Sequence, residues 1–145
     1  MEIQLLEKFH IEACSPLFVE AFSCEAWNEQ YESDREVIGY FTTFLSLDSF
    51  LGFVGIESGC VIALCVGMCK PWLKGVEYYI DLFFVAPDFQ CRGIGSLFLA
   101  GIERRIADLG MKGILLNTER TYPAYGFYRK NGFTEIEGLT VMGKE

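Results

Sequence analysis

This sequence has a single histidine, and it shows neither a secretory leader nor a long apolar run. His10 is the only histidine and no two cysteines are spaced C-x-x-C, so the usual ligands of a structural zinc are missing. Met1-Glu2-Ile3-Gln4 has neither the basic start nor the apolar stretch of a signal peptide. The longest apolar stretch, Cys60 to Cys69, is far too short to span a bilayer. We therefore expect a cytoplasmic protein with no metal and no membrane span.

Positive charge is also scarce. Lys and Arg number 12 against 20 Asp and Glu, so the net charge is −8 and the pI is about 4.7. A nucleic-acid-binding surface needs a basic stripe, so that class of protein is disfavoured. An acidic surface would attract a cationic substrate, although acidic charge that merely keeps an apolar protein soluble explains most of these carboxylates. The six cysteines form no compact framework, which favours buried free thiols over disulfides.

What the chain does contain is apolar and aromatic material for a core. Its 145 residues are 51% apolar and 15% aromatic, which suits one folded domain spanning residues 1–145. We find no internal repeat, linker or low-complexity segment. The high apolar content also motivates the hypothesis of a homodimer that hides an apolar patch.

A strand, a glycine-containing turn and a helix follow one another between Val76 and Leu109. Tyr78–Val85 is rich in aromatic and β-branched residues, as strands are. Gln90-Cys91-Arg92-Gly93-Ile94-Gly95 then opens a run with helical apolar spacing. Such a turn points free backbone N–H groups at an anion, and its two glycines let a phosphate approach the main chain. An ordinary strand–helix connection is the alternative interpretation of the turn taken alone.

The spacing of this turn excludes two better-known phosphate loops. The chain has no G-x-x-x-x-G-K-[ST], so nothing supports a nucleotide triphosphatase. It has no G-x-G-x-x-G either, because Ser96, Leu97 and Phe98 follow the second glycine. A dinucleotide-binding unit is therefore disfavoured.

Two motifs together resemble the GNAT superfamily of acyl-CoA-dependent N-acyltransferases. Gln90-x-x-Gly93-x-Gly95 after a strand is similar to the family's acyl-CoA pyrophosphate loop, and Ala124-x-x-x-Tyr128-x-x-x-Gly132-Phe133 is similar to the short helix and turn at its active site. The resemblance covers residues 50–145 best. It implies an α/β (α+β) fold with a central mixed, mostly antiparallel sheet of about six to seven strands flanked by about four helices.

Periodicity and turn residues place the elements of that fold. Strands are predicted at residues 2–9, Phe50–Ile56, Cys60–Met68, Tyr78–Val85, Gly113–Thr118, Phe133–Ile136 and Leu139–Lys144. Helices are predicted at Ile11–Phe22, from Ser33 to about Leu47, from the glycine turn to near Gly110, and at Ala124–Lys130. Ser33-Asp34-Arg35-Glu36 is a capping box, and Glu57-Ser58-Gly59 is a hairpin turn. Lys70–Gly75 is predicted to be a loop.

The resemblance implies transfer of an acetyl group from acetyl-CoA, as co-substrate, to a primary amine by direct attack in a ternary complex. The acceptor would be a small molecule or a peptide. A catalytically silent CoA-binding sensor or interaction module of the same fold is the alternative, and a longer acyl group is a third hypothesis.

Residues that hold the cofactor follow from the same resemblance. In the family, the strand before the loop splays from its neighbour and leaves main-chain groups for the pantetheine arm. Thr121 stands where many members have an asparagine, so either Asn117, four residues earlier, supplies a substitute contact or the contact is absent. The predicted cofactor-binding residues are Phe83, Phe84, Val85, Gln90, Cys91, Arg92, Gly93, Ile94, Gly95, Ser96, Asn117 and Tyr128.

Two residues are predicted to be catalytic. Tyr128 matches the family's tyrosine acid and would protonate the leaving thiolate, with Tyr122 and Tyr125 as its rivals. Asp81 lies inside an apolar strand, where a carboxylate is costly unless it has a partner or a role. It would bind the amine or accept its proton, and Glu77 or a water chain are the alternatives. Strand alternation predicts that Tyr79, Asp81, Phe83 and Val85 share one face, and that Ile80, Leu82 and Phe84 share the other.

The acceptor pocket is predicted to lie near the first two helices. By resemblance, Trp27, Tyr31, Tyr40 and Phe41 are candidates for its lining, although ordinary core aromatics would look the same. Acidic side chains at Glu25, Glu29 and Glu32 would attract an amine or simply form a solvated face.

Overall fold

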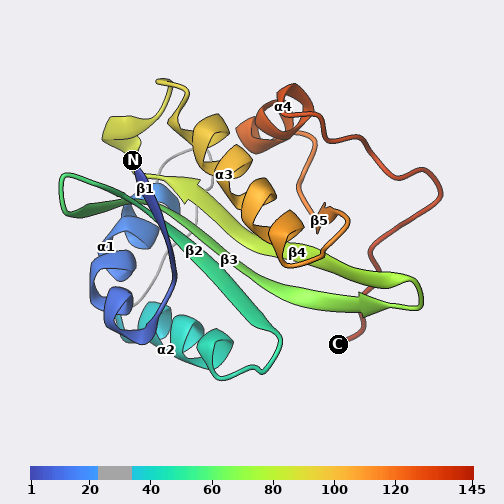
Figure 1. Cartoon of the computed structure of the whole chain (residues 1–145), viewed down its shortest axis with the longest axis horizontal. Coiled ribbons are helices and arrows are strands. Elements are labelled where there is room, and N and C mark those ends of the chain that lie inside the picture. The colour runs from blue at the N-terminus through green and yellow to red at the C-terminus, as the bar shows by residue number, and fades with distance from the viewer. Residues whose placement is uncertain (23–33) are drawn as a thin grey trace.

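A sheet of five strands forms the middle layer of the part of the chain that the computed structural model describes, residues 1–22 and 34–145 (Figure 1). The strands lie in the order of the chain, and they are β1 (Glu2–Leu5), β2 (Phe50–Glu57), β3 (Cys60–Trp72), β4 (Gly75–Val85) and β5 (Ile114–Leu116). The first four pair antiparallel, whereas β5 is parallel to β4. The prediction of a mixed, mostly antiparallel sheet is confirmed.

Helices cover both faces of this sheet (Figure 1). They are α1 (Ile11–Phe22), α2 (Asp34–Leu45), α3 (Ile94–Asp108) and α4 (Pro123–Lys130), with single 3₁₀ turns η1 (Lys8–His10) and η2 (Pro87–Phe89). Their bounds are close to those predicted. Gly110 and Gly132 follow α3 and α4 with φ of 85° and 91°, and they end these helices because only glycine adopts such angles readily. Ser33, the predicted cap of α2, lies outside the described residues.

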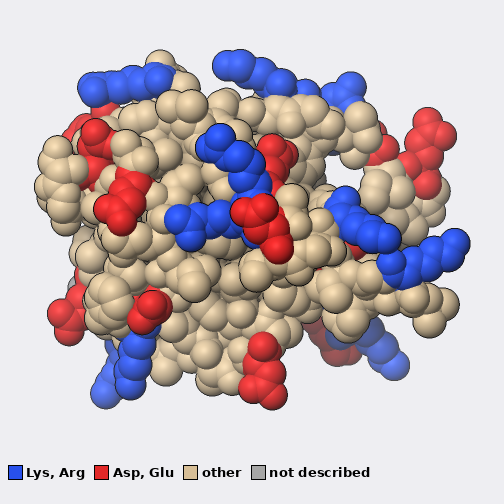
Figure 2. Space-filling view, viewed as in Figure 1, with Lys and Arg blue, Asp and Glu red and all other residues tan. Residues whose placement is uncertain are grey.

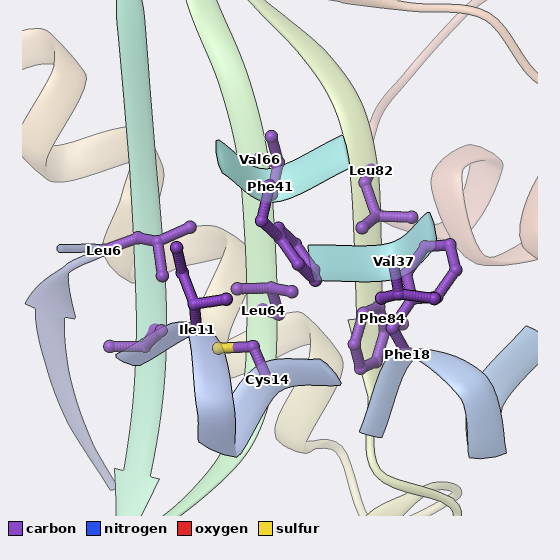
Figure 3. Packing of buried hydrophobic residues seen from close by; sticks show 11 residues of the cluster. Leu6, Ile11, Cys14, Phe18, Val37, Phe41, Leu64, Val66, Leu82 and Phe84 are labelled. Carbon is purple, nitrogen blue, oxygen red and sulfur yellow. The ribbon is translucent and has the colours of Figure 1, made fainter. Parts of the chain in front are cut away.

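Two apolar clusters fill the spaces between the sheet and the helices. The first joins α1 and α2 to the sheet, and Figure 3 shows its side chains converging from both layers: Leu6, Ile11, Cys14, Phe18, Val37, Phe41, Leu64, Val66, Leu82 and Phe84. The second lies under α3 and α4, and its buried members are Phe53, Ala63, Cys65, Tyr78, Ile80, Val85, Phe98, Leu99, Ile102 and Ile106. Strand β3 contributes to both clusters, as predicted for a central strand that is covered on both faces.

Two tight turns set the register of the long strands. Ser58 and Gly59 have φ of 50° and 78°, the left-handed pair that a two-residue hairpin prefers, and the predicted turn is confirmed. The predicted loop at Lys70–Gly75 is wrong. Strand β3 continues through Trp72 and β4 begins at Gly75, and these two residues pair across the hairpin. The backbone hydrogen bonds between β3 and β4 extend beyond the apolar parts of the two strands. The sequence pattern predicts only those apolar parts as strand.

A β-bulge interrupts β4 at Asp81. Val66 pairs with Leu82, but the next residue, Gly67, pairs with Ile80, so Asp81 is the extra residue. A side chain at Gly67 would collide with the carbonyl of Tyr79 across the strands, and the bulge therefore needs glycine there. Past an extra residue, side-chain alternation reverses.

The bulge divides residues that strand alternation had grouped together. Ile80 packs under α3, whereas Leu82 and Phe84 pack under α1 and α2, so the predicted common face of these three is wrong. Asp81 is directed to Tyr40 of α2, while Phe83 and Val85 belong to the cluster under α3. The prediction that Asp81 shares a face with Phe83 and Val85 is also wrong.

The C-terminal segment is the other departure from prediction. Residues 131–145 contain no strand, so Phe133–Ile136 and Leu139–Lys144 do not extend the sheet and the described strands are five rather than six or seven. Leu139, Val141 and Met142 are 73–87% exposed, so this stretch has no buried face. Gly138, with φ of 79°, interrupts the extended backbone between the two predicted strands.

The cysteines of the described residues are all free: Cys14, Cys60, Cys65, Cys69 and Cys91. Cys14 and Cys65 are buried as predicted, whereas Cys60 and Cys91 are exposed.

Candidate active site

A cavity of about 420 Å³ lies between the end of β4, the start of α3, and α4. Its walls come from three sequence segments that the two motifs had marked. The lining residues are Phe83, Phe84, Val85, Gln90, Cys91, Gly93, Gly95, Ser96, Pro123, Ala124, Gly126, Phe127, Tyr128 and Lys130.

The cavity begins where β4 leaves β5. The two strands pair only from Tyr78 to Ile80, and beyond Ile80 that edge of β4 has no strand partner among the described residues. The Ala86 N–H donates to the Ile62 carbonyl of β3 at 2.7 Å, so by alternation the N–H groups of Val85 and Phe83 point the opposite way, toward the open edge. Main-chain donors are thus presented to whatever occupies the cavity.

The turn before α3 has the backbone of an anion-binding site. Cys91 and Gly93 have φ of 59° and 76°, and successive turns of this kind orient N–H groups into one concavity. Helix α3 begins directly after Gly93, and its first backbone hydrogen bond runs from Leu97 N–H to Gly93 O at 3.1 Å. The N–H groups of Ile94, Gly95 and Ser96 precede that bond and lie at the positive end of a 15-residue helix.

The two motif glycines do different things. A Cβ at Gly93 would meet no atom within 4 Å, so this glycine is needed for its left-handed backbone and leaves space open beside the turn. A Cβ at Gly95 would come 3.1 Å from Cε2 of Phe127, so this glycine lets α3 and α4 approach closely. Gln90 has a third role, because its side-chain amide donates to the Val85 carbonyl at 2.8 Å and ties the turn to β4.

Most of the predicted cofactor-binding residues line the cavity, but three do not. The guanidinium of Arg92 lies over the ring of Phe89, 5.8 Å from its centre, and Ile94 packs against the second apolar cluster. The side-chain amide of Asn117 donates to the Tyr79 hydroxyl at 2.9 Å, so the predicted substitute for the family's asparagine is engaged elsewhere.

Lys130 lines the cavity and was missed from the sequence. It is an exposed cation in the last turn of α4, two residues after Tyr128, and a lysine at a helix end carries no sequence signal of its own. Figure 2, in the orientation of Figure 1, shows Lys and Arg side chains along the upper edge, over the turn before α3 and over α4. The molecule therefore carries positive side chains in this region although its net charge is −8.

Tyr128 lies in the wall of the cavity inside an aromatic cage. The side chain is 8% exposed, and its ring meets Phe83, Phe127 and Phe133 with centres 6.4, 5.3 and 5.3 Å apart. Its hydroxyl has no hydrogen-bond partner among the described residues. Burial, and then the proximity of Cys65, raise the pKa of this phenol well above its usual value, so it stays protonated at neutral pH. Neither of its rivals, Tyr122 and Tyr125, lines the cavity.

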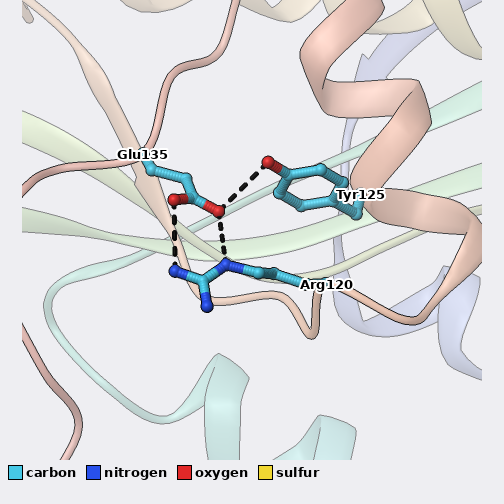
Figure 4. A network of polar contacts seen from close by, with 3 residues as sticks. All are labelled: Arg120, Tyr125 and Glu135. Atoms are coloured by element: carbon cyan, nitrogen blue, oxygen red, sulfur yellow. Dashed lines mark hydrogen bonds and ion pairs between the residues drawn. The ribbon is translucent and has the colours of Figure 1, made fainter.

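A polar clamp holds the segments on either side of α4 together (Figure 4). Arg120 donates through Nε and an Nη atom to the Glu135 carboxylate at 2.6 and 3.2 Å, and the Tyr125 hydroxyl donates to the same carboxylate at 3.0 Å. Hydrogen bonds from Arg120 and Tyr125 lower the pKa of Glu135. The clamp is exposed, and it links the start of α4 to the chain after its end.

Asp81 does not line the cavity and instead faces α2. Its carboxylate accepts a hydrogen bond of 2.5 Å from the Tyr40 hydroxyl. Burial and the charge of Asp81 raise the pKa of the neighbouring Tyr79. Glu77, the rival base, does not line the cavity either. Of the residues predicted for the acceptor pocket, Phe41 is fully buried in the first cluster and Tyr40 donates to Asp81. The remaining ones lie outside the described residues: Trp27, Tyr31, Glu25, Glu29 and Glu32.

The described ranges 1–22 and 34–145 contain neither a metal-binding cluster nor a membrane-spanning helix. These residues bring together no group of three or more His, Cys, Asp or Glu that could hold a metal ion. None of the helices in those ranges has both the length and the apolar character needed to cross a bilayer.

Comparison with known proteins identifies the family and the fold of the chain. A family model described as "Acetyltransferase (GNAT) domain" matches residues 31–135. No curated protein sequence matches the chain. Among solved structures, the aminoglycoside N-acetyltransferase AAC(6')-Iy in complex with CoA is 19% identical, with a TM-score of 0.76 over 99% of this chain and 93% of that one.

Two further structures illustrate the range of similar proteins. The aminoglycoside acetyltransferase meta-AAC0020, from an uncultured soil metagenomic sample and in complex with sisomicin, is 15% identical, with a TM-score of 0.77 over 99% of this chain and 95% of that one. A GNAT family acetyltransferase of Staphylococcus aureus is 16% identical, with a TM-score of 0.74 over 97% of each chain. At these identities the likeness shows the fold alone.

Proposed function

The chain belongs to the GNAT acetyltransferase family, and from that premise we propose that it transfers an acetyl group from acetyl-CoA to a primary amine on a cationic acceptor. The observation that carries the proposal is the cavity at the open edge of β4, with a helix N-terminus and Lys130 on its walls beside the Tyr128 phenol. An anionic group, a thioester and a proton donor would meet in that one space.

Binding of CoA is the first step of the proposal. The diphosphate lies against the N–H groups of residues 94–96, where the helix dipole favours negative charge. Lys130 adds a cation on the cavity wall, and Ser96 adds a hydroxyl. Arg92, which is exposed beside the turn, contributes through its charge rather than by lining the cavity.

Acetyl transfer follows at the open edge of β4. The N–H groups of Phe83 and Val85 polarise the thioester carbonyl, and the amine nitrogen attacks its carbon as the carbon–sulfur bond breaks. The Tyr128 hydroxyl hydrogen-bonds to the departing sulfur and gives it a proton, which water then returns to the phenol. Burial raises the pKa of Tyr128, so the phenol of the free enzyme is protonated and has a proton to donate to the sulfur. Asp81 faces α2 rather than the cavity, so it receives the proton of the amine through water.

The acceptor class is argued from charge. A net charge of −8 attracts a cation, and a carboxylate at the bulge suits an ammonium group. Two of the similar structures are named as aminoglycoside acetyltransferases, so amino sugars belong first in a panel of acceptors, followed by polyamines, amino acids and peptide N-termini.

A turnover screen tests the proposal. Acetyl-CoA is incubated with the protein and each amine, and released thiol is measured together with the mass of the acetylated product. We expect thiol release that depends on both the protein and a cationic amine. Acetyl-CoA binding without turnover of any amine would favour the alternative, a CoA-binding sensor, and faster turnover of a larger acyl-CoA would change the proposed donor.

Binding is tested separately through the melting temperature, which a bound ligand raises by mass action. We expect CoA to raise the Tm of the wild type, and Gly93→Glu to lose this shift because a carboxylate would occupy the space of the phosphates. Gly110→Glu is the matched control, because Gly110 also has positive φ and open surroundings but does not line the cavity. Loss of the CoA shift in both variants would point to backbone strain instead.

Cytoplasmic location and homodimerisation are part of the same proposal. Free thiols in the described residues suit a reducing compartment. The exposed Leu139, Val141 and Met142 form an apolar stretch suited to contact with a second copy. Light scattering of the full chain at micromolar concentration gives its mass, and a monomer would reject the dimer.

A further inference from the structure

The carboxylate of Asp81 stands without a cation in the described part of the chain, where the ion pairs are Met1 with Glu57 and Arg120 with Glu135. Asp81 is exposed and lies at the bulge, one residue past the last pair between β4 and β5. It therefore stands where the sheet opens, on the face opposite the cavity that contains Tyr128.

Tyr40 determines where this carboxylate points. Its hydroxyl donates the 2.5 Å hydrogen bond to Asp81 across 41 residues of sequence. The Tyr40 ring is itself held by Phe18, Phe41 and Phe44, with ring centres 5.9, 5.3 and 5.3 Å away. A donor with so little freedom holds a charged acceptor in one position, and a hydrogen bond to a carboxylate is among the stronger ones.

A second polar pair flanks the same opening. The Asn117 amide, just after β5, donates to the Tyr79 hydroxyl at 2.9 Å. Tyr79 lies two residues before Asp81, and burial and then the charge of the Asp81 carboxylate raise the pKa of its phenol. In residues 1–22 and 34–145 this carboxylate has no cation, and with two phenols and an amide nearby it is suited to an ammonium group that carries hydrogen-bonding groups of its own.

From this arrangement, and resting on the proposed function, we infer that Tyr40 is a positioning residue for the acceptor. It holds the Asp81 carboxylate as the docking point of the acceptor's ammonium group.

A double-mutant cycle tests this inference. Tyr40→Phe, Asp81→Asn and the double variant are compared in KM and kcat for the best amine, in KM for acetyl-CoA, and in Tm. We expect Tyr40→Phe to raise the amine KM about tenfold, the loss of one hydrogen bond to a charged group, with the acetyl-CoA KM unchanged. The double variant should be no worse than Asp81→Asn, because Tyr40 acts through Asp81. Additive losses, or equal changes in both KM values, would overturn the inference.

Tyr125→Phe is the matched control. It also removes a phenol hydroxyl that donates to a carboxylate, that of Glu135 at 3.0 Å, but near the other face of the sheet. We expect its amine KM to equal that of the wild type.

A binding measurement tests the role of Tyr40 independently of acetyl transfer. Calorimetry measures sisomicin and spermidine binding to the CoA-loaded wild type and to Tyr40→Phe. Amine binding that weakens about tenfold in Tyr40→Phe supports the inference even if no acetyl group is transferred. If neither cation binds the wild type, or if both bind Tyr40→Phe equally well, the inference is wrong whatever the turnover screen shows.

Discussion

Gly95 at the start of α3 lies against the ring of Phe127 in α4, so closely that a Cβ atom on residue 95 would come 3.1 Å from Cε2 and 3.4 Å from Cζ of that ring. The ring cannot easily move away, because it stacks on Phe83 at 5.5 Å and touches Tyr128. The second glycine of the turn therefore sets the distance between the two helices that enclose the cavity.

Enlarging residue 95 should destabilise the protein and narrow the cavity. We expect Gly95→Leu to lower the free energy of unfolding by about 1–3 kcal/mol, the usual cost of overpacking, and to reduce the CoA-induced rise in Tm. Gly39→Leu in α2 is the control, since a Cβ at Gly39 would meet no atom within 4 Å. Replacing a glycine inside a helix also stabilises the helix. Urea unfolding measures both variants, and equal stability of the two would contradict the packing argument.

Lys130 should contribute to CoA affinity, whereas its neighbour Arg129 should not. Lys130 lines the cavity, and removing one charge-assisted contact to a phosphate costs on the order of 1 kcal/mol in a solvated site. Lys130→Ala should therefore weaken CoA binding about five- to tenfold, with a smaller salt dependence than the wild type. Arg129→Ala removes the same charge outside the cavity wall and should change the Kd less than about twofold. Calorimetry at two salt concentrations measures the CoA affinity of both variants. If both lose affinity equally, the effect comes from the net charge of the protein and not from a contact made by Lys130.

Local patterns could predict the turn and α4 because the structures they encode are local. The positions of Gly93, Gly110 and Gly132 follow from backbone angles that glycine adopts readily. Pro123 similarly marks the start of α4. A motif of this kind can be recognised before its neighbours are known, and the cavity accordingly contains most of the residues that the motifs marked.

The misplaced residues depend on contacts between segments far apart in the sequence. Asp81 changes face because of a bulge, and the bulge needs Gly67 on the neighbouring strand. Lys130 reaches the cavity because Phe127 packs on Gly95. The stretch Leu139–Lys144 contains apolar and β-branched residues that strands favour, yet a strand also needs a partner edge, which this stretch does not find in the described chain.

Tyr128→Phe should separate binding from transfer. The ring and its aromatic cage remain, so CoA should raise the Tm as in the wild type, while kcat should fall by about 10²- to 10⁴-fold through loss of the proton donor. Because burial raises the pKa of Tyr128 above its ordinary value of 10.0, ionisation of this phenol should not reduce wild-type activity below that pH. Tyr125→Phe, whose hydroxyl donates to Glu135, serves as the control. Turnover of Tyr128→Phe at the wild-type rate would remove Tyr128 from the mechanism.

Stability should decline as the pH rises above about 9, because buried groups stay protonated only in the folded state. Burial raises the pKa of both Cys14 and Cys65 from 9.0 to about 12, so between these values the unfolded chain binds fewer protons than the folded one. The contribution of these two protonated thiols to the free energy of unfolding is complete below pH 9 and is lost progressively toward pH 12. Tm measured from pH 7 to 11 under reducing conditions should fall less steeply in Cys14→Ala than in the wild type. Cys60→Ala, at an exposed thiol, should keep the wild-type slope, and an unchanged slope in Cys14→Ala would show that this thiol does not contribute.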